Sequence, residues 1–296
     1  MKKKFSQFWY GVICCFVAEA SYGVNGYGAE HLYRAGFDTP TVLFFRFFLA
    51  SCILALFLLF RREPIRTDRR DILVGISCGF LFCGSALPLY LSFKVMDTGL
   101  ACTLLFVYPI FVVIMSALLF KERITWQILL TILVAGAGIG LLSGTGSGHI
   151  SLRGFILVML SAASYAVYMI VYQKWPPKMS QYKMTFFSTA FSAVGIVLYS
   201  LLAHNPIRMP SSPATWGWAV FLAIIPTVIS VFFTVESIKY VGSTLTATLG
   251  ALEPLTAIVL GVAFLGEPMT VASFFGSLLV LGAVIFAILQ PNKAKG

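Results

Sequence analysis

Ten long apolar stretches occupy most of this chain and decide what it can fold into. A bilayer core about 30 Å thick is crossed by a helix of about 20 mostly apolar residues. The segments between the stretches are too short to form a soluble domain, which excludes a catalytic head or a ligand-binding ectodomain. The sequence therefore predicts an all-α membrane protein with transmembrane helices at about 7–28, 40–60, 72–92, 98–119, 125–143, 153–173, 183–203, 215–236, 243–265 and 271–289.

Composition supports a membrane protein and argues against other partners. Of the 296 residues, 59% are hydrophobic and 11% are charged, whereas soluble domains carry about 25% charged residues. The formal net charge is +10, but the lysines and arginines stand at helix ends, so they indicate topology and not binding to nucleic acid. No metal or other cofactor is expected, because the six cysteines lie inside apolar stretches without metal-ligand spacing.

The distribution of positive charge predicts the orientation. With the N-terminus inside, sixteen lysines and arginines lie on the inner side, and four lie on the outer side (Arg34, Lys94, Arg153 and Arg208). This asymmetry predicts a multi-pass protein of the inner (plasma) membrane with both termini in the cytoplasm. The first stretch also resembles a cleavable signal, with Lys2-Lys3-Lys4 before it and an A-x-A site at Ala18-Glu19-Ala20.

An internal repeat argues against cleavage. Residues 93–109 align with residues 238–254 at an offset of 145, which pairs Pro109 with Pro254. Nearer the start of each half, Ala20-Ser21-Tyr22 aligns with Ala163-Ser164-Tyr165 at an offset of 143. The first helix thus has a partner in the second half. We expect two similar repeats, at residues 1–148 and 149–296.

The repeats should be inverted, because five is an odd number of crossings and the second half enters from the opposite face. Inverted repeats are typical of secondary transporters, whose substrate site lies near the midplane at the repeat interface. The sequence therefore favours a transporter of small molecules. A channel, a lipid flippase or a membrane-embedded enzyme remain alternatives, although we find no cluster of catalytic side chains. A monomer would suffice.

Three ionisable side chains lie well inside apolar stretches: Glu19, Arg46 and Glu253. A charged group at the bilayer centre costs about 2.5–3.5 kcal/mol even on lenient scales, so such a group faces a partner or a cavity. We expect these three to bind substrate or protons. The alternative is a static ion pair, for example between Arg46 and Glu19, that only fixes helix packing.

Polar neighbours extend this candidate site. Tyr22 follows Glu19 on one face of the first helix, and Tyr165 and Tyr168 lie on the corresponding face of the sixth helix. Pro109 and Pro254 each remove a helical hydrogen bond near mid-membrane, which frees a carbonyl group close to the expected site. A simple kink is the alternative interpretation of the two prolines.

Five short motifs stand at matching points of the two halves or in the second helix: Phe45-Arg46-Phe47, Tyr108-Pro109, Lys121-Glu122-Arg123, Leu252-Glu253-Pro254 and Gly266-Glu267-Pro268. These motifs resemble those of the EamA family of the drug/metabolite transporter superfamily. The resemblance covers essentially the whole chain and implies ten helices and alternating-access export or exchange of small metabolites, often amino acids. The first half has Tyr108 where the second has Glu253, so only the second carboxylate is carried over as a candidate site group.

The charges within the membrane favour one class of cargo. Two carboxylates face one guanidinium group, whereas a phosphorylated cargo would need several buried cations. We therefore expect a zwitterionic, neutral or cationic cargo such as an amino acid. A proton or the ammonium group of the cargo would bind at Glu19 or Glu253.

Overall fold

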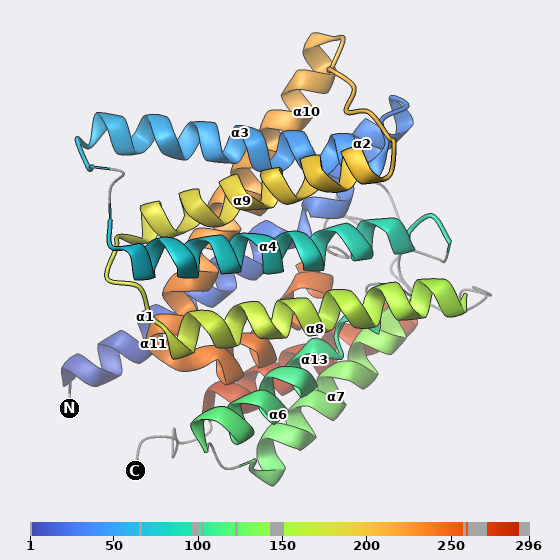
Figure 1. The fold of residues 1–296 in the computed structure, drawn as a ribbon. Coiled ribbons are helices and arrows are strands. Elements are labelled where there is room, and N and C mark those ends of the chain that lie inside the picture. The colour runs from blue at the N-terminus through green and yellow to red at the C-terminus, as the bar shows by residue number, and fades with distance from the viewer. Residues whose placement is uncertain are drawn as a thin grey trace.

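The computed structural model describes residues 2–64, 67–95, 101, 104–121, 124–142, 151–256, 259 and 271–289. All regular elements among these residues are helical. The chain is an all-α membrane protein of ten helices in two inverted five-helix repeats. Figure 1 shows most of these helices running side by side, with α10 rising away from the others at one end.

Five described helical segments are long and apolar enough to cross a membrane unaided, with mean hydropathies from 1.7 to 2.6. The fifth is not one straight helix. It consists of α10 (Pro213–Ala223), a π-helical turn η1 (Ile224–Ile229) and α11 (Ser230–Leu249). Within α11 the backbone leaves the helical conformation at Gly242 and the chain changes direction, so that the hydroxyl groups of Ser237 and Thr246 lie 2.9 Å apart. The other four are α3 (Thr39–Phe60), α4 (Arg69–Ser92), α8 (Leu152–Lys174) and α9 (Gln181–Leu202).

Polar caps set where several of these helices begin. A serine or aspartate side chain accepts a hydrogen bond from the backbone N–H three residues later, which satisfies a donor that the first turn leaves free. These starts lie within two residues of those expected from the sequence. The capping residues are Asp38, Ser151, Ser180 and Ser212.

The remaining described helices are α1 (Lys2–Gly23), α2 (Asn25–Arg34), α6 (Tyr108–Phe120), α7 (Trp126–Leu142) and α13 (Val271–Leu289). The first expected span, 7–28, is wrong at its ends, because two helices meet at Val24 and continue to Arg34. The fourth and ninth spans are also not single helices. Each is interrupted by a turn, at residues 106–107 and 250–251.

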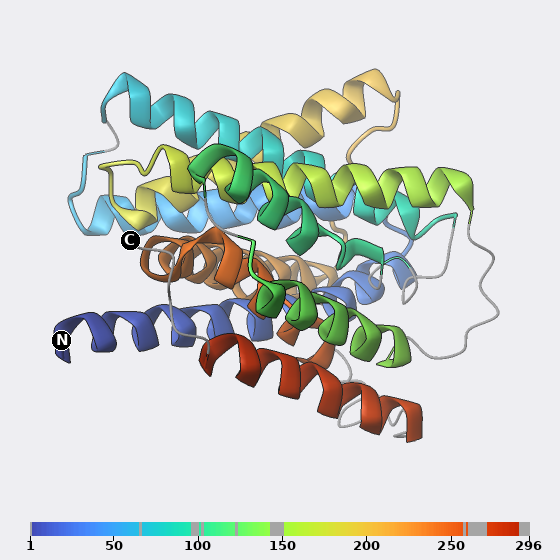
Figure 2. The same cartoon turned by 90° about the horizontal axis from the view of Figure 1, so that it is seen from below.

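Helix packing follows the repeat. The main contacts join α1 with α11, α4 with α8, α3 with α9, and α7 with α13. In the repeat, α1 corresponds to α8, α4 to α11, α3 to α9 and α7 to α13. The α1–α11 contact therefore corresponds to the α8–α4 contact, and the α3–α9 and α7–α13 contacts each join two corresponding helices. This is the pattern that a two-fold relation between the repeats requires. Figure 2 shows α7 and α13 together at one edge of the molecule.

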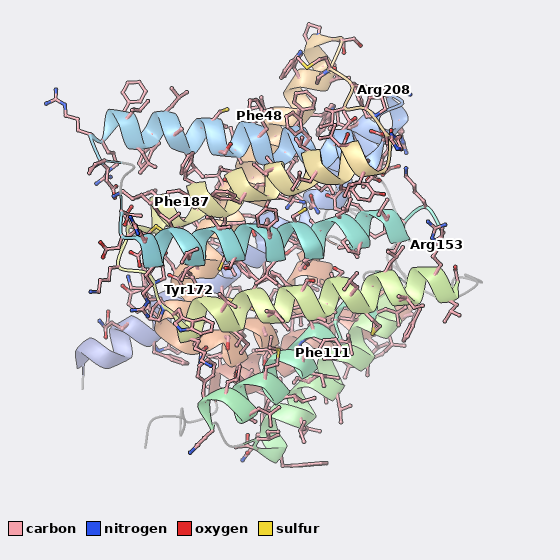
Figure 3. The ribbon with its side chains drawn as sticks, in the orientation of Figure 1. Phe48, Phe111, Arg153, Tyr172, Phe187 and Arg208 are labelled. Carbon is pink, nitrogen blue, oxygen red and sulfur yellow. The ribbon has the colours of Figure 1, made fainter. Side chains whose placement is uncertain are left out.

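The α7–α13 contact depends on small residues. A Cβ atom on Gly138 would lie 2.9 Å from the carbonyl oxygen of Gly276. Small residues at such contacts let membrane helices approach closely. Large apolar side chains such as Phe48 (42% exposed) point outward instead, as Figure 3 shows for α3.

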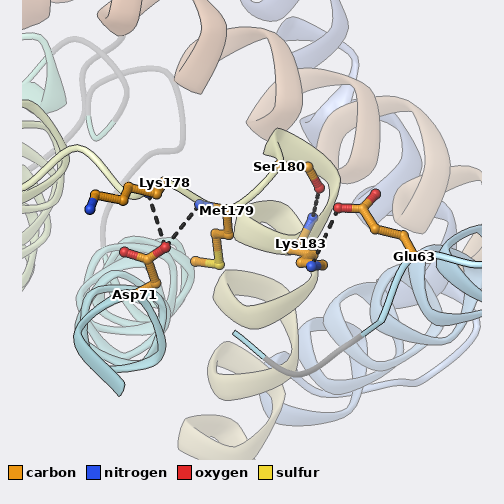
Figure 4. Close-up of polar contacts among 6 residues, drawn as sticks. All are labelled: Glu63, Asp71, Lys178, Met179, Ser180 and Lys183. Atoms are coloured by element: carbon orange, nitrogen blue, oxygen red, sulfur yellow. Dashed lines mark hydrogen bonds and ion pairs between the residues drawn. The ribbon is translucent and has the colours of Figure 1, made fainter. Parts of the chain in front are cut away.

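One end of the bundle is tied by polar contacts. Asp71, at the start of α4, accepts hydrogen bonds from the backbone N–H groups of Lys178 (3.0 Å) and Met179 (2.8 Å). Lys183 of α9 forms an ion pair with Glu63 at 3.5 Å. Figure 4 shows both contacts, which join the α3–α4 connection to the α8–α9 connection. Arg153 and Arg208 lie at the opposite end (Figure 3).

Candidate functional site

Two helix breaks define the centre of the candidate site. The turn at Phe106-Val107 precedes α6, and the turn at Gly250-Ala251 precedes a helical segment at 252–256. The offset of 145 aligns Tyr108-Pro109 with Glu253-Pro254 and brings the two turns to within one residue of each other. In both repeats a proline thus stands in the first turn after the break, where its missing N–H group costs nothing.

The two breaks touch each other. The Tyr108 hydroxyl donates a hydrogen bond to the carbonyl oxygen of Ala247 over 3.1 Å, between two buried groups. A Cβ atom added to Gly250 would overlap the same hydroxyl. The tyrosine of the first break therefore fills space that exists only because the second break contains a glycine.

Helix α1 runs along the second break. Cys15 donates to the carbonyl oxygen of Thr246 at 3.6 Å, and a Cβ atom on Gly23 would lie 2.7 Å from the carbonyl oxygen of Glu253. Glu19 lies between these two positions, one turn from each, so it shares the same face of α1.

The two candidate carboxylates are neighbours. Glu19 is 4% exposed, and its carboxyl group interacts electrostatically with that of Glu253. Among the residues that the structure describes, neither side chain has a hydrogen bond or an ion pair. Glu19 is thus buried and Glu253 partly exposed, and neither has a compensating cation at contact distance among the described residues.

Tyrosine rings line one side of the carboxylates. The rings of Tyr108 and Tyr165 meet edge to face at 5.0 Å, and Tyr165 stacks on Tyr168 at 5.8 Å with an interplanar angle of 6°. The hydroxyl groups of Tyr108 and Tyr165 lie near both Glu19 and Glu253. Tyr168 lies behind them, against Phe82. We call the rings of Tyr108, Tyr165 and Tyr168 the tyrosine wall.

Arg46 is fully buried and each of its nitrogens has a protein acceptor. Nε donates to the Thr227 hydroxyl (2.7 Å), Nη1 to the Tyr90 hydroxyl (3.2 Å) and Nη2 to the Pro226 carbonyl (3.0 Å). Pro226 and Thr227 belong to η1. A π-helical turn shifts the backbone hydrogen-bond pattern, and such turns are frequent at functional sites.

Tyr22 lies between the guanidinium group and the carboxylates. The Cζ atom of Arg46 is 5.3 Å from the centroid of the Tyr22 ring, a cation–π contact. Arg46 and Glu253 interact electrostatically, but within the described ranges Arg46 forms no ion pair with Glu253 or Glu19. The static Arg46–Glu19 ion pair considered above is therefore not formed, because Arg46 is held by η1 and Tyr90.

Sequence reasoning missed the partners of Arg46. The Tyr90 hydroxyl also donates to Asn25, over 2.7 Å, at the start of α2. One signal was present: Pro226-Thr227 interrupts an apolar stretch at mid-depth, as Pro109 and Pro254 do. The motifs Lys121-Glu122-Arg123 and Gly266-Glu267-Pro268 lie outside the described residues, except for Lys121.

The site therefore combines groups from both repeats. The first repeat provides Glu19, Tyr22, Arg46 and Tyr108, and the second provides Glu253 and the partners of Arg46 in η1. The described residues include no group of three side chains that could hold a metal ion. What the arrangement offers is one buried region with two acids, one guanidinium group and aromatic faces, suited to binding a small polar molecule.

Comparison with known proteins places the chain among transporters. The model of the EamA-like transporter family matches it twice, over residues 9–144 and 152–289. The uncharacterized transporter YdfC of Bacillus subtilis (strain 168) is 26% identical over 92% of this chain and 85% of its own length. The threonine/homoserine exporter RhtA of Escherichia coli (strain K12) is 26% identical over 94% of this chain and 90% of its own length.

Two further proteins are also similar. An uncharacterized transporter of Archaeoglobus fulgidus is 27% identical over 86% of this chain and 88% of its own length. A solved crystal structure superposes with a TM-score of 0.78 at 19% identity and covers 97% of this chain and 99% of that chain. At this identity the likeness concerns the fold alone.

Proposed function

The chain belongs to the EamA-like transporter family, and on that premise we propose that it exports or exchanges amino-acid-like metabolites by alternating access between its two repeats. Membership confirms the resemblance noted from the sequence. It makes the chain a multi-pass membrane transporter of a small molecule and excludes an enzyme. Cargo, mechanism and site are the proposed part.

The contact between Tyr108 and the second helix break carries the proposal. Transporters with inverted repeats bind substrate where discontinuous helices meet at the repeat interface. Here the two breaks, at equivalent positions of the repeats, meet through the Tyr108–Ala247 hydrogen bond. Near this point the cargo would be held by Glu19, Glu253, Arg46 and Tyr22. The rings of Tyr165 and Tyr168 would lie behind them. The two helix breaks would be maintained by Pro109 and Pro254.

Charge supports an amino-acid-like cargo. Two carboxylates and one guanidinium group match a zwitterion better than a phosphorylated compound, whose charge would need several buried cations. The relative RhtA is named a threonine/homoserine exporter, which agrees with this choice of cargo.

Further elements of the proposal concern energy and placement. A proton at Glu19 or Glu253 would replace the cargo on the return step and so couple transport to the proton gradient. The protein would lie in the inner membrane with both termini in the cytoplasm, the orientation that the charge asymmetry predicts. Residues 1–148 and 149–296 would act as the two moving units of a functional monomer.

Transport in proteoliposomes tests the proposal. Purified protein is reconstituted, and entry of labelled threonine is measured after loading the vesicles with unlabelled threonine and after loading them with buffer. We expect saturable counterflow that unlabelled amino acids inhibit and that a nucleotide sugar does not. Tight inhibition by a nucleotide sugar, with none by amino acids, would contradict the proposed cargo.

A further inference from the structure

The charged side chains of the site differ in how many interactions they form with the protein. Each nitrogen of Arg46 donates to a protein acceptor, and its guanidinium group also lies 5.3 Å from the ring centroids of Tyr22 and Phe47. A carboxylate of the cargo would have to compete with these acceptors or use the remaining N–H groups. Arg46 is thus built into the protein as a brace between α3, α4 and η1.

Glu19 and Glu253, in contrast to Arg46, lack such partners among the described residues. Glu19 is 4% exposed and interacts with Glu253, and in the described part of the chain neither carboxylate has a cation within 4 Å. Placing two like charges together away from water is unfavourable unless a positive charge joins them. Arg46 is held by three neutral acceptors and, within the described ranges, forms no ion pair with either acid, so a positive charge in contact with the acids would come from the cargo.

The tyrosine wall fits the same ligand group. An ammonium group is attracted to the face of an aromatic ring, and the attraction increases where water is excluded. Tyr108 lies against Gly250, whose carbonyl oxygen accepts the backbone N–H of Glu253, and the Tyr108 ring meets that of Tyr165 at 5.0 Å, so a cation bound between the acids would lie near these rings. A carboxylate placed there would meet the acids and the electron-rich ring faces, and both repel it.

We infer that the site recognises its cargo by the cationic amine and not by the carboxylate. Amines without a carboxyl group therefore bind at least as well as the corresponding amino acids, and the deaminated acids do not bind. This inference rests on the proposed function, because it concerns the same site. It extends the substrate class from amino acids to organic amines.

Three matched sets of ligands distinguish recognition of the amine from recognition of the carboxylate. Each set contains an amino acid, its decarboxylated amine and its deaminated acid: threonine, 1-amino-2-propanol and 3-hydroxybutanoate; leucine, 3-methylbutylamine and 4-methylpentanoate; phenylalanine, phenethylamine and 3-phenylpropanoate. The full-length protein in detergent is unfolded by heat with each ligand, and the rise in the midpoint is titrated. A charged contact of this kind changes affinity by about tenfold or more.

We expect at least one amine to raise the midpoint, at concentrations no higher than its amino acid requires. The matching acid should require at least about tenfold more. Two outcomes overturn the inference: the acid stabilises the protein and its amine does not, or no amine stabilises it at all. The counterflow experiment reports on transport separately, so amine binding without transport would contradict the proposed function and leave this inference standing.

Variants locate the binding. Glu19→Gln and Glu253→Gln should each lose the midpoint shift caused by the amine. Glu236→Gln is a matched control, since Glu236 is 6% exposed but already pairs with Lys239 at 3.7 Å, and it should keep the shift. Tyr165→Phe should keep it and Tyr165→Leu should weaken it, because only the first retains a ring. An unchanged shift in both carboxylate variants would place the amine elsewhere and contradict the inference.

Discussion

The hydroxyl group of Tyr108 donates a hydrogen bond to the carbonyl oxygen of Ala247, 3.1 Å away and 139 residues later in the chain. The same carbonyl also accepts the backbone N–H of Gly250 at 3.2 Å. Buried carbonyl groups need such partners. A side chain from the break in one repeat thus completes the backbone hydrogen bonding of the break in the other, which couples the two breaks directly.

This coupling predicts that Gly250→Ala is damaging. The new Cβ atom would overlap the Tyr108 hydroxyl, and relieving such overpacking costs about 1–3 kcal/mol. We expect a lower unfolding midpoint and at least about a tenfold loss of transport. Gly217→Ala is the control, because a Cβ atom there meets nothing within 4 Å.

The cause can be isolated by combining Gly250→Ala with Tyr108→Ala. Once the ring is gone, the added methyl group should change stability by less than about 0.5 kcal/mol, the limit for independent sites. If Gly250→Ala is equally damaging in both backgrounds, the clash with Tyr108 is not the reason.

Arg46→Lys should destabilise the protein by about 1–3 kcal/mol, the usual cost of leaving buried hydrogen-bond partners unmatched. A lysine has no planar fork and cannot reach Thr227, Tyr90 and the Pro226 carbonyl together. Chemical unfolding in detergent measures the change. Arg34→Lys is the control: Arg34 is 75% exposed in its ion pair with Glu30, and such surface pairs contribute little. Equal midpoints for the two variants would contradict the bracing role of Arg46.

Glu19→Gln should weaken threonine counterflow, and the rate that remains should no longer depend on pH. Glutamine has nearly the same shape as a protonated glutamate but neither takes up nor releases a proton, so a step that needs this exchange becomes insensitive to pH. The measurement is the counterflow rate across a pH series with equal pH on both sides of the membrane. A pH profile like that of the unaltered protein would exclude Glu19 as the coupling group.

Asp71→Ala should loosen the α8–α9 connection. The Asp71 carboxylate accepts the N–H groups of Lys178 and Met179, and hydrogen bonds to a charged group contribute about 1.5–3 kcal/mol. Hydrogen exchange at these two amides should accelerate by about tenfold or more. Asp68→Ala is the control, because Asp68 precedes α4 without a side-chain capping bond. Unchanged exchange after Asp71→Ala would show that other contacts hold the loop.

The sequence predicted the features that depend on local pattern. The lengths of the apolar stretches predicted the helices. The helices capped by Ser180 and Ser212 begin close to the expected positions. The paired prolines Pro109 and Pro254 indicated where the helical hydrogen bonding would fail. Each of these signals is contained in a few neighbouring residues, which is why the sequence alone reveals it.

The partners across the bundle were not predictable in this way. Arg46 and Thr227 are 181 residues apart, and their contact depends on how η1 packs against α3. The complete break at Gly250-Ala251 was likewise hidden, since a proline predicts a kink as readily as a turn. The alternative of an ion pair between Arg46 and Glu19 is not what the structure has, because charge alone does not say which neutral acceptors lie closer.

The location of the cargo at the junction of the two breaks is tested most directly by comparing Glu253→Gln with Glu236→Gln in proteoliposomes. Both replace a carboxylate of the second repeat by an amide, Glu236 being buried and Glu253 partly exposed, but only Glu253 follows a helix break. Threonine counterflow should fall at least about tenfold in Glu253→Gln, the effect of losing one charged contact, and remain in Glu236→Gln, with both proteins folded. Counterflow that persists in Glu253→Gln and disappears in Glu236→Gln would contradict the account.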